Sequence, residues 1–181
     1  MTTRTLEVER STSTAHRLAY YDGVCGNIHG HNMEWEVEVE VSMVDTGDGN
    51  MPLDLKDISS RIDEVDHAVI FGRDDELLRF VYEHSDVLHH DELDDPDYPI
   101  NSSTQFMFSD DIEPLGDVFV FAGDPTCEVL CQWMADRLVN SIEAVISAEV
   151  TVYETDKYGI TGSASGCTCG KDDACDKCGG D

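Results

Sequence analysis

The clearest pattern in the chain is an alternation of apolar and polar positions between Met33 and Met43. Apolar side chains occupy every second position, and the positions between them are Glu34, Glu36, Glu38, Glu40 and Ser42. A period of two places one set of side chains on a buried face and the other on the solvent face of a long strand. Leu6 and Val8 alternate with glutamates in the same way, so an earlier strand is expected to pair with it antiparallel.

Apolar positions recur at helical spacing in two later segments. The first set predicts an amphipathic helix that ends near Asp66, and it comprises Leu55, Ile58, Ile62 and Val65. A second helix is expected to begin at Asp124-Pro125, with Asp124 as its N-cap and the proline at the first helical position. Its apolar stripe consists of Val129, Leu130, Trp133, Met134 and Leu138.

Two more strands are expected, over about 149–154 and 118–121. The order of these elements predicts an α+β fold in which two main helices cover one face of an antiparallel sheet. The domain is expected to span residues 1–162 and to include an acidic stretch, about 72–124, that forms an elaborated mobile loop. Residues 163–181 are rich in Gly, Ser, Asp and Cys and are expected to form a tail outside the core.

The net charge limits both partners and environment. The chain has 39 acidic and 11 basic residues, a formal net charge of −28 at pH 7. Such a surface repels nucleic-acid phosphates and anionic membranes, which excludes both as partners. Hydrophobic residues make up 40% of the chain, too many for a disordered acidic tail. The charge is typical of a halophile, where molar salt shortens the screening length to about 3 Å.

The termini indicate location and redox context. The first ten residues lack the apolar stretch of a signal peptide, and no apolar run is long enough to span a membrane, so we expect a cytoplasmic protein. An odd number of cysteines, seven, favours metal chemistry over a secreted disulfide framework. Four of them form a C-x-C-x5-C-x2-C pattern near the end: Cys167, Cys169, Cys175 and Cys178. They can hold a closed tetrahedral zinc site, and a redox-active or unstructured tail is the alternative.

Three histidines accompany the predicted strand pair. His29 and His31 project from one face of a strand, and His16 lies on the neighbouring strand. Three imidazoles with an open fourth position are the pattern of catalytic zinc, whereas ordinary surface histidines are the alternative. Cys25, four residues before His29, is a fourth ligand, a buried thiol or a reactive thiolate. Asp66 precedes His67, and an adjacent carboxylate can orient an imidazole for proton transfer, although this pair is common.

Five short motifs occur in an order that carries a family resemblance: Thr14-Ala15-His16-Arg17-Leu18, Cys25-x3-His29-Gly30-His31-Asn32, Val65-Asp66-His67, Pro125-Thr126-Cys127-Glu128 and Glu154-Thr155. Over about residues 6–160 the chain resembles the 6-pyruvoyltetrahydropterin synthase family, which includes the 6-carboxytetrahydropterin synthases. The resemblance implies a T-fold whose subunits join their sheets into a β-barrel, as a trimer or hexamer, with sites at subunit interfaces.

The resemblance also implies roles for individual residues. His16, His29 and His31 would bind zinc, and Cys25 would be the proton-abstracting residue. Asp66 and His67 would form the proton relay. Glu154 would anchor the pterin ring, and Thr126, in the Pro-Thr-x-Glu motif, would contribute to substrate binding. Two carboxylate oxygens can accept both hydrogen bonds from a guanidine-like N–H edge, which suits the role of Glu154.

The implied activity is zinc-dependent conversion of 7,8-dihydroneopterin triphosphate to 6-carboxy-5,6,7,8-tetrahydropterin, a precursor of the deazaguanines archaeosine and queuosine. Three residues separate Cys25 from His29, a spacing that goes with the carboxy-forming branch of the family. The alternatives are a 6-pyruvoyltetrahydropterin synthase, which eliminates triphosphate, and a non-catalytic zinc- or pterin-binding module.

The chain departs from the family pattern at several positions near the motifs. Thr12 replaces a usual Phe, Thr14 an Ala, Met33 a Tyr and Val129 an Asn, and Ile70-Phe71 replaces Leu-Asn. The proposed metal and proton-transfer groups are all retained, so the departures bear on how the pterin and its side chain are held.

Overall fold

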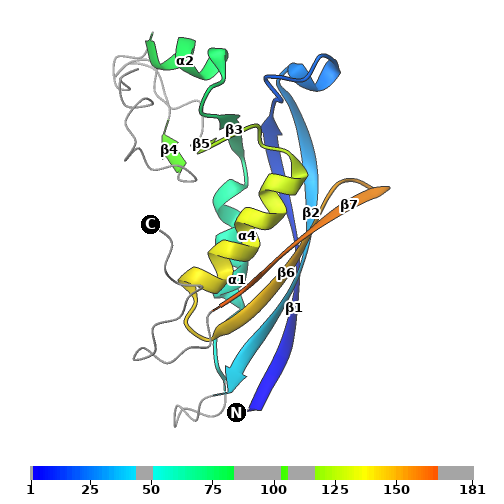
Figure 1. Ribbon diagram of the computed structural model, residues 1–181, viewed down its shortest axis with the longest axis vertical. Helices are drawn as coiled ribbons and strands as arrows, with labels where there is room; N and C mark the ends of the chain where they lie inside the picture. Colours follow the sequence, from blue (N-terminus) through cyan, green and yellow to red (C-terminus); the bar gives the residue numbers. More distant parts are fainter. Residues whose placement is uncertain (1, 44–50, 84–102, 106–116, 167–181) are drawn as a thin grey trace, which may run out of the picture.

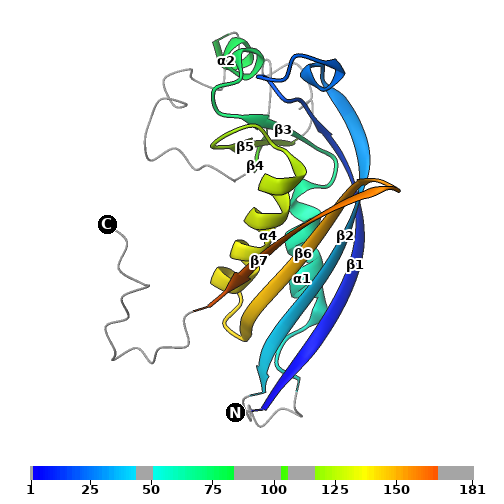
Figure 2. The ribbon, with the colours of Figure 1, turned by 45° about the vertical axis from the view of Figure 1, so that its right-hand side comes forward.

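The computed structural model describes residues 2–43, 51–83, 103–105 and 117–166. Its centre is a seven-stranded sheet with the order β4-β5-β3-β1-β2-β6-β7 (Figure 1). The helices α1 and α4 lie side by side on the concave face of the curved sheet, as a second view confirms (Figure 2). An α+β architecture with two main helices on one face was the prediction from the sequence, and it is confirmed.

The longest strands are β1 (Thr2–His16) and β2 (His29–Met43), which pair antiparallel along their whole length. β2 also pairs with β6 (Val145–Thr155), which pairs with β7 (Tyr158–Ser165), again antiparallel. The alternation that predicted β2 is confirmed, because its inward-facing side chains are buried and belong to the core: Met33, Trp35, Val37, Val39 and Val41. β7 extends the sheet to Ser165, so the first three residues of the predicted tail, 163–165, belong to the sheet.

The helix layer follows the predicted amphipathic segments. Helix α1 (Leu55–Ile62) continues into the 3-10 turn η2 (Asp63–Val65), and the Asp54 side chain caps α1 by accepting a bond from Lys56 N–H. Helix α4 (Cys127–Ser141) begins two residues later than predicted, because Thr126 rather than Asp124 is its N-cap. α4 lies very close to β7. A Cβ added at Gly162 would stand 2.6 Å from the backbone nitrogen of Gln132, so only glycine fits there.

A parallel part of the sheet was not predicted. β3 (Ala68–Gly72) pairs parallel with the end of β1 and with β5 (Asp117–Phe121), while β4 (Ser103–Gln105) pairs antiparallel with β5. The sheet is therefore mixed, not wholly antiparallel. Within the expected loop, the structure also places helix α2 (Glu76–Glu83), where Leu78 and Tyr82 pack in a small second core with Phe71, Val118 and Val120. Residues 84–102 and 106–116 of that loop lie outside the described residues.

The face of the sheet opposite the helices is acidic. The register places Glu7 opposite Glu38 and Glu38 opposite Glu149, so three carboxylates form a row across β1, β2 and β6. Glu9 stands opposite Glu36 in the same way. Like charges at directly opposite positions destabilise a strand pair. The salt dependence expected from the net charge can therefore be assigned to particular side chains.

Replacing Glu38 with glutamine is expected to stabilise the fold in low salt by about 1 kcal/mol, because it removes two like-charge neighbours at once. In molar salt the gain should vanish, since the screening length falls to about 3 Å. Denaturant unfolding along a salt series measures both. Glu143→Gln, an exposed site just after α4, makes the same change in net charge and is the control. Equal gains from both substitutions, or a gain that persists in molar salt, would contradict the assignment.

Candidate metal centre

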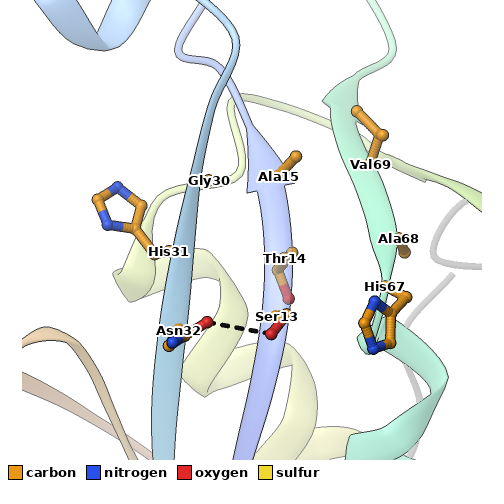
Figure 3. Close-up of a pocket in the computed structure, with 9 residues that line it drawn as sticks. All are labelled: Ser13, Thr14, Ala15, Gly30, His31, Asn32, His67, Ala68 and Val69. Carbon is orange, nitrogen blue, oxygen red and sulfur yellow. Dashed lines mark hydrogen bonds between the residues drawn. The ribbon is translucent and has the colours of Figure 1, made fainter.

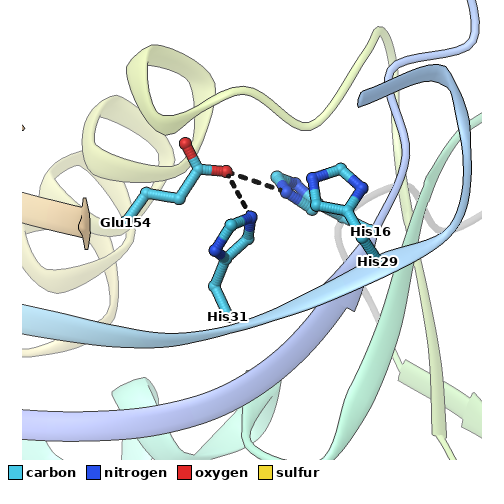
Figure 4. Close-up of side chains that lie close together, drawn as sticks. All are labelled: His16, His29, His31 and Glu154. Carbon is cyan, nitrogen blue, oxygen red and sulfur yellow. Dashed lines mark hydrogen bonds and ion pairs between the residues drawn. The ribbon is translucent and has the colours of Figure 1, made fainter. Parts of the chain in front are cut away.

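Three histidines converge where β1 ends and β2 begins. His16 is the last residue of β1 and stands directly opposite His29, the first residue of β2, while His31 is opposite Thr14. Along both strands they continue the set of side chains that faces the core. The ring centroids are 4.7 Å apart for His16 and His29, 5.4 Å for His16 and His31, and 4.9 Å for His29 and His31 (Figure 4). The structure thus brings together the three residues that the spacing singled out.

Backbone carbonyls orient two of the rings. His16 Nδ1 lies 3.0 Å from the carbonyl oxygen of Pro125, and His29 Nδ1 lies 2.8 Å from that of Asn27. A carbonyl only accepts, so Nδ1 carries the proton in both rings and Nε2 is left to bind a ligand. The Nε2 atom of His29 is buried and has no hydrogen-bond partner within the described part of the chain. This arrangement is typical of histidines that bind metal through Nε2.

Glu154, near the end of β6, completes the cluster. Its Oε1 atom lies 3.0 Å from Nε2 of His16 and 3.0 Å from Nε2 of His31 (Figure 4). One ligand atom from each of the four residues lies within 4.8 Å of the others. The resemblance assigned Glu154 to the pterin ring, and that role stays a prediction, while the structure places its carboxylate beside two of the three histidines. Three imidazoles and a carboxylate are a donor set that suits zinc.

Burial controls the charge of two groups in this region. The pKa of His31 is lowered, chiefly because burial disfavours the imidazolium and also through the neighbouring His16 and His29, while Glu154 opposes the shift. His31 is therefore neutral at neutral pH, with a lone pair available. Burial, followed by the charges of Glu154 and Glu128, raises the pKa of Cys127 to about 12. A thiol of that pKa stays protonated, so Cys127, which sequence analysis did not single out, is a poor proton acceptor at neutral pH.

Cys25 lies in the short turn η1 (Val24–Gly26), within the connection between β1 and β2. Its carbonyl oxygen accepts a hydrogen bond from Leu18 N–H at 2.9 Å, which closes the connection two residues beyond His16. The thiol is partly exposed and is not in a disulfide. The structure thus places Cys25 in the loop that follows one histidine of the cluster and precedes the other two.

Asp66 and His67 follow η2 and are held against β1. Asp66 Oδ1 accepts a bond from Ser13 N–H at 2.8 Å, and His67 N–H donates to the carbonyl of Ser13 at 2.8 Å. His67 has φ 58°, a left-handed conformation that is uncommon outside glycine. Its ring is exposed, and Nε2 lies 3.9 Å from Asp66 Oδ2, beyond hydrogen-bonding distance. The carboxylate therefore fixes the backbone beside His67 and does not hold its ring.

His67 is not part of the histidine cluster in the single chain. It lines a shallow hollow of about 460 Å³ together with Ser13 and Asn32, whose side chains are hydrogen-bonded to each other at 3.0 Å (Figure 3). Ser13 and Asn32 belong to the exposed set of positions on β1 and β2, whereas the cluster continues the core-facing set. His67 therefore stands apart from the four-residue cluster, although His31 of the cluster also lines this hollow.

Two departures from the family pattern, Thr12 and Thr14, have a structural role. Trp35 Nε1–H donates to Thr12 Oγ1 at 2.9 Å, and Thr14 Oγ1 donates to the carbonyl of Val65 at 3.0 Å. Both threonines are buried directly beneath His16 on the same face of β1. The Thr14 hydroxyl connects β1 to the residue that precedes Asp66, and the Thr12 hydroxyl connects β1 to Trp35 of β2.

The remaining predicted site residues have structural explanations or lie elsewhere. Thr126 caps α4, its Oγ1 accepting from Val129 N–H at 3.4 Å, so its predicted contact with substrate stays a prediction. The cysteines of the predicted second zinc site, Cys167, Cys169, Cys175 and Cys178, lie outside the described residues. In the part of the chain that is described, no helix is both long and apolar enough to cross a bilayer.

Comparison with known proteins identifies the family. Residues 5–164 match the family described as 6-pyruvoyl tetrahydropterin synthase. The chain belongs to this family of enzymes. That membership, with the residues described above, supports a pterin synthase function. The chain is 28% identical over 158 residues, 84% of each sequence, to a Halobacterium salinarum protein named "Probable 6-carboxy-5,6,7,8-tetrahydropterin synthase". It is 34% identical over 74 residues, 38% of this chain, to the Haemophilus influenzae 6-carboxy-5,6,7,8-tetrahydropterin synthase, of which 52% is covered.

Solved structures share the fold of this chain. An uncharacterized protein from Wolinella succinogenes superimposes with a TM-score of 0.63 at 19% identity, covering 91% of this chain and 99% of that one. The Plasmodium vivax 6-pyruvoyltetrahydropterin synthase superimposes with a TM-score of 0.52 at 19% identity, with the same coverage. At this identity the likeness concerns the fold alone, and it confirms the predicted T-fold of the subunit.

Proposed function

We propose that the protein is a zinc-dependent 6-carboxy-5,6,7,8-tetrahydropterin synthase, which converts 7,8-dihydroneopterin triphosphate in a route to deazaguanines. The observation that carries the proposal is the convergence of His16, His29 and His31, with Nδ1 of the first two held by carbonyls. The spacing of Cys25 and His29 and the names of both curated relatives favour the carboxy-forming reaction. A cytoplasmic location is part of the same proposal.

The donor set fits zinc by its chemistry. Neutral imidazole nitrogen is a preferred zinc ligand, and the buried Nε2 of His29 lacks a hydrogen-bond partner in the described structure. When bound, zinc would act as a Lewis acid that polarises an oxygen of the substrate side chain. Glu154 then has two possible tasks, as a fourth ligand or, by turning away from the histidines, as the acceptor for the N–H edge of the pterin.

The proton transfers are assigned to the chain's own residues. The Cys25 thiolate would remove a proton from the substrate side chain, and His67 would return one at another position. Asp66 would keep His67 in place through its bond to Ser13 N–H. The expected product arises by carbon–carbon cleavage with loss of the side-chain fragment and triphosphate, and water supplies the second oxygen of the carboxylate.

The separation of His67 from the cluster supports assembly of the site from two subunits. β3 covers β1 only at Ala15 and His16, and β7 is paired on one side only, so both strands have open edges within the described chain. Joining the β1 edge of one copy to the β7 edge of the next would place His67 of one copy near the strand that carries Glu154 in the other. We propose that the protein closes into a barrel in this way, as a trimer or a hexamer of two stacked rings.

Subunit mixing tests this assembly. His16→Ala removes a zinc ligand, and His67→Asn removes the relay imidazole while tolerating the same backbone conformation. Co-expressed in equal amounts, the two inactive variants should recover about a quarter of wild-type activity. Half of the subunits carry an intact cluster, and half of those lie beside a subunit with an intact His67. Activity no higher than that of either variant alone would show that both groups act within one chain.

The reaction itself is tested by product mass. The zinc-loaded protein is incubated with 7,8-dihydroneopterin triphosphate in molar salt, and the product is identified by mass spectrometry. The proposal expects 6-carboxy-5,6,7,8-tetrahydropterin. Formation of 6-pyruvoyltetrahydropterin would support the second candidate, which the family description favours. Unchanged substrate that nevertheless binds would indicate a non-catalytic module.

A further inference from the structure

The turn between β5 and α4 contacts the loop that carries Cys25. Asp124 Oδ1 accepts a hydrogen bond from Ala19 N–H at 3.1 Å, and Asp124 Oδ2 accepts one from Tyr20 N–H at 3.2 Å. Sequence reasoning assigned this carboxylate to the N-cap of the helix, but Thr126 performs that task. Asp124 therefore has a different role, which the family assignment does not supply.

The loop that Asp124 holds has little apolar anchoring. Its large apolar side chains are mostly in solvent, with exposed fractions of 77% for Tyr20, 56% for Tyr21, 81% for Val24 and 49% for Ile28. Its internal hydrogen bonds are short-range turns, with the bond from Leu18 N–H to Cys25 O across its base. A loop with few buried contacts opens easily, so the two charge-assisted bonds to Asp124 carry much of its order.

Pro125, the next residue of the same turn, contacts the histidine cluster. The carbonyl of Pro125, directly after Asp124, accepts the Nδ1–H of His16. One turn thereby fixes a histidine of the metal centre through Pro125 and the loop beyond it through Asp124. The turn thus connects the loop that carries Cys25 to His16.

We propose that Asp124 is a positioning residue that holds the loop carrying Cys25 against the turn that orients His16. The role of Cys25 as the base rests on the proposed function, but its dependence on Asp124 does not. Loss of the carboxylate should release the 19–25 segment and leave the zinc ligands in place, because the bond to His16 comes from the backbone of Pro125.

The test measures how fast Cys25 is alkylated by iodoacetamide in the zinc-loaded protein, by peptide mass mapping. Asp124→Ala should increase the rate about tenfold, since one lost charge-assisted bond changes a local equilibrium by at least that factor. Asp124→Asn keeps one acceptor and should give an intermediate rate, which also covers the case in which the alanine variant fails to fold. Zinc content should stay at the wild-type value.

Thr126→Ala is the matched control from the same turn. It removes the helix cap and lowers stability, but it leaves both bonds to the loop intact, so Cys25 should react at the wild-type rate. Equal alkylation rates in wild type, Asp124→Asn and Asp124→Ala would overturn the proposal and leave Asp124 with a purely structural role.

Turnover supplies a second readout. With 7,8-dihydroneopterin triphosphate, Asp124→Ala should lower kcat about tenfold with little change in KM, because the bound substrate meets a displaced base. A fall in kcat that Asp54→Ala reproduces, by removing the N-cap of α1 far from the site residues, would also contradict the proposal. If the wild-type protein does not turn over the pterin, the proposed function fails, and the alkylation rates still decide the role of Asp124.

Discussion

Replacing His29 with alanine is expected to remove the zinc bound by the histidine cluster and to lower turnover by about a thousandfold, the rate equivalent of several kcal/mol of lost charge stabilisation. His29 is the most informative ligand because its Nδ1 is committed to the carbonyl of Asn27 and its buried Nε2 has no hydrogen-bond partner among the described residues. Alanine leaves only two imidazoles and Glu154. Zinc per subunit, measured by elemental analysis, and steady-state kinetics give the result.

The cysteine tail must be controlled in this experiment, because it is a second candidate zinc site. In a Cys175→Ala/Cys178→Ala background the parent protein should hold about one zinc ion per subunit and the His29→Ala variant none. If the wild-type protein holds two zinc ions per subunit and the Cys175→Ala/Cys178→Ala protein holds one, the tail binds metal. His67→Asn should retain its zinc, since His67 lies outside the cluster. Retention of zinc by the His29→Ala protein would place the metal elsewhere.

The second large effect is expected at Cys25. Cys25→Ala should lower kcat by about a hundredfold to ten-thousandfold, the usual contribution of a positioned base, while zinc content stays unchanged. The reason is that Cys25 lies in the loop beside the metal ligands and not among them. Metal analysis and kinetics on the same preparation separate an effect on zinc binding from an effect on proton abstraction.

Cys127→Ala is the matched control for Cys25. Cys127 lies close enough to Glu154 for that carboxylate to raise its pKa, yet with a pKa of about 12 it is protonated at neutral pH and cannot serve as the base. Its removal should change kcat by less than about threefold, as expected of a group that takes no part in proton transfer. If Cys25→Ala retained full turnover, or if Cys127→Ala were the inactive variant, the assignment of the base would be wrong.

The sequence predicted most reliably the long elements that expose one side to water, although it also indicated the buried β5 and missed β7. β2 alternates over its whole length because one face meets the helices and the other meets solvent, and α1 is amphipathic for the same reason. β3 (Ala68–Gly72) could not be recognised in this way, because nearly all its residues are buried and a short apolar run has no period. Its parallel pairing also depends on contacts with β5, about fifty residues later, which no local pattern reveals.

The same distinction between local pattern and long-range pairing applies to the candidate site. His16, His29 and His31 were predictable because adjacent strands and a spacing of two bring them to one face. The approach of Glu154 depends on the pairing of β2 with β6, far along the chain. Asp124 and Thr126 are both good helix caps by residue type. The choice between them is made by Ala19 and Tyr20, whose N–H groups occupy the Asp124 carboxylate.

The backbone conformation of His67 suggests that activity and thermal stability favour different residues at this position. A non-glycine residue with φ 58° carries a conformational cost of about 1 kcal/mol or more, which the fold tolerates where the side chain is needed. Asparagine and glycine adopt that conformation more readily. The His67→Asn protein used for subunit mixing should therefore melt at or above the wild-type temperature while being inactive. A selection for heat resistance alone would tend to discard the histidine, which agrees with the proposed use of its imidazole in proton transfer.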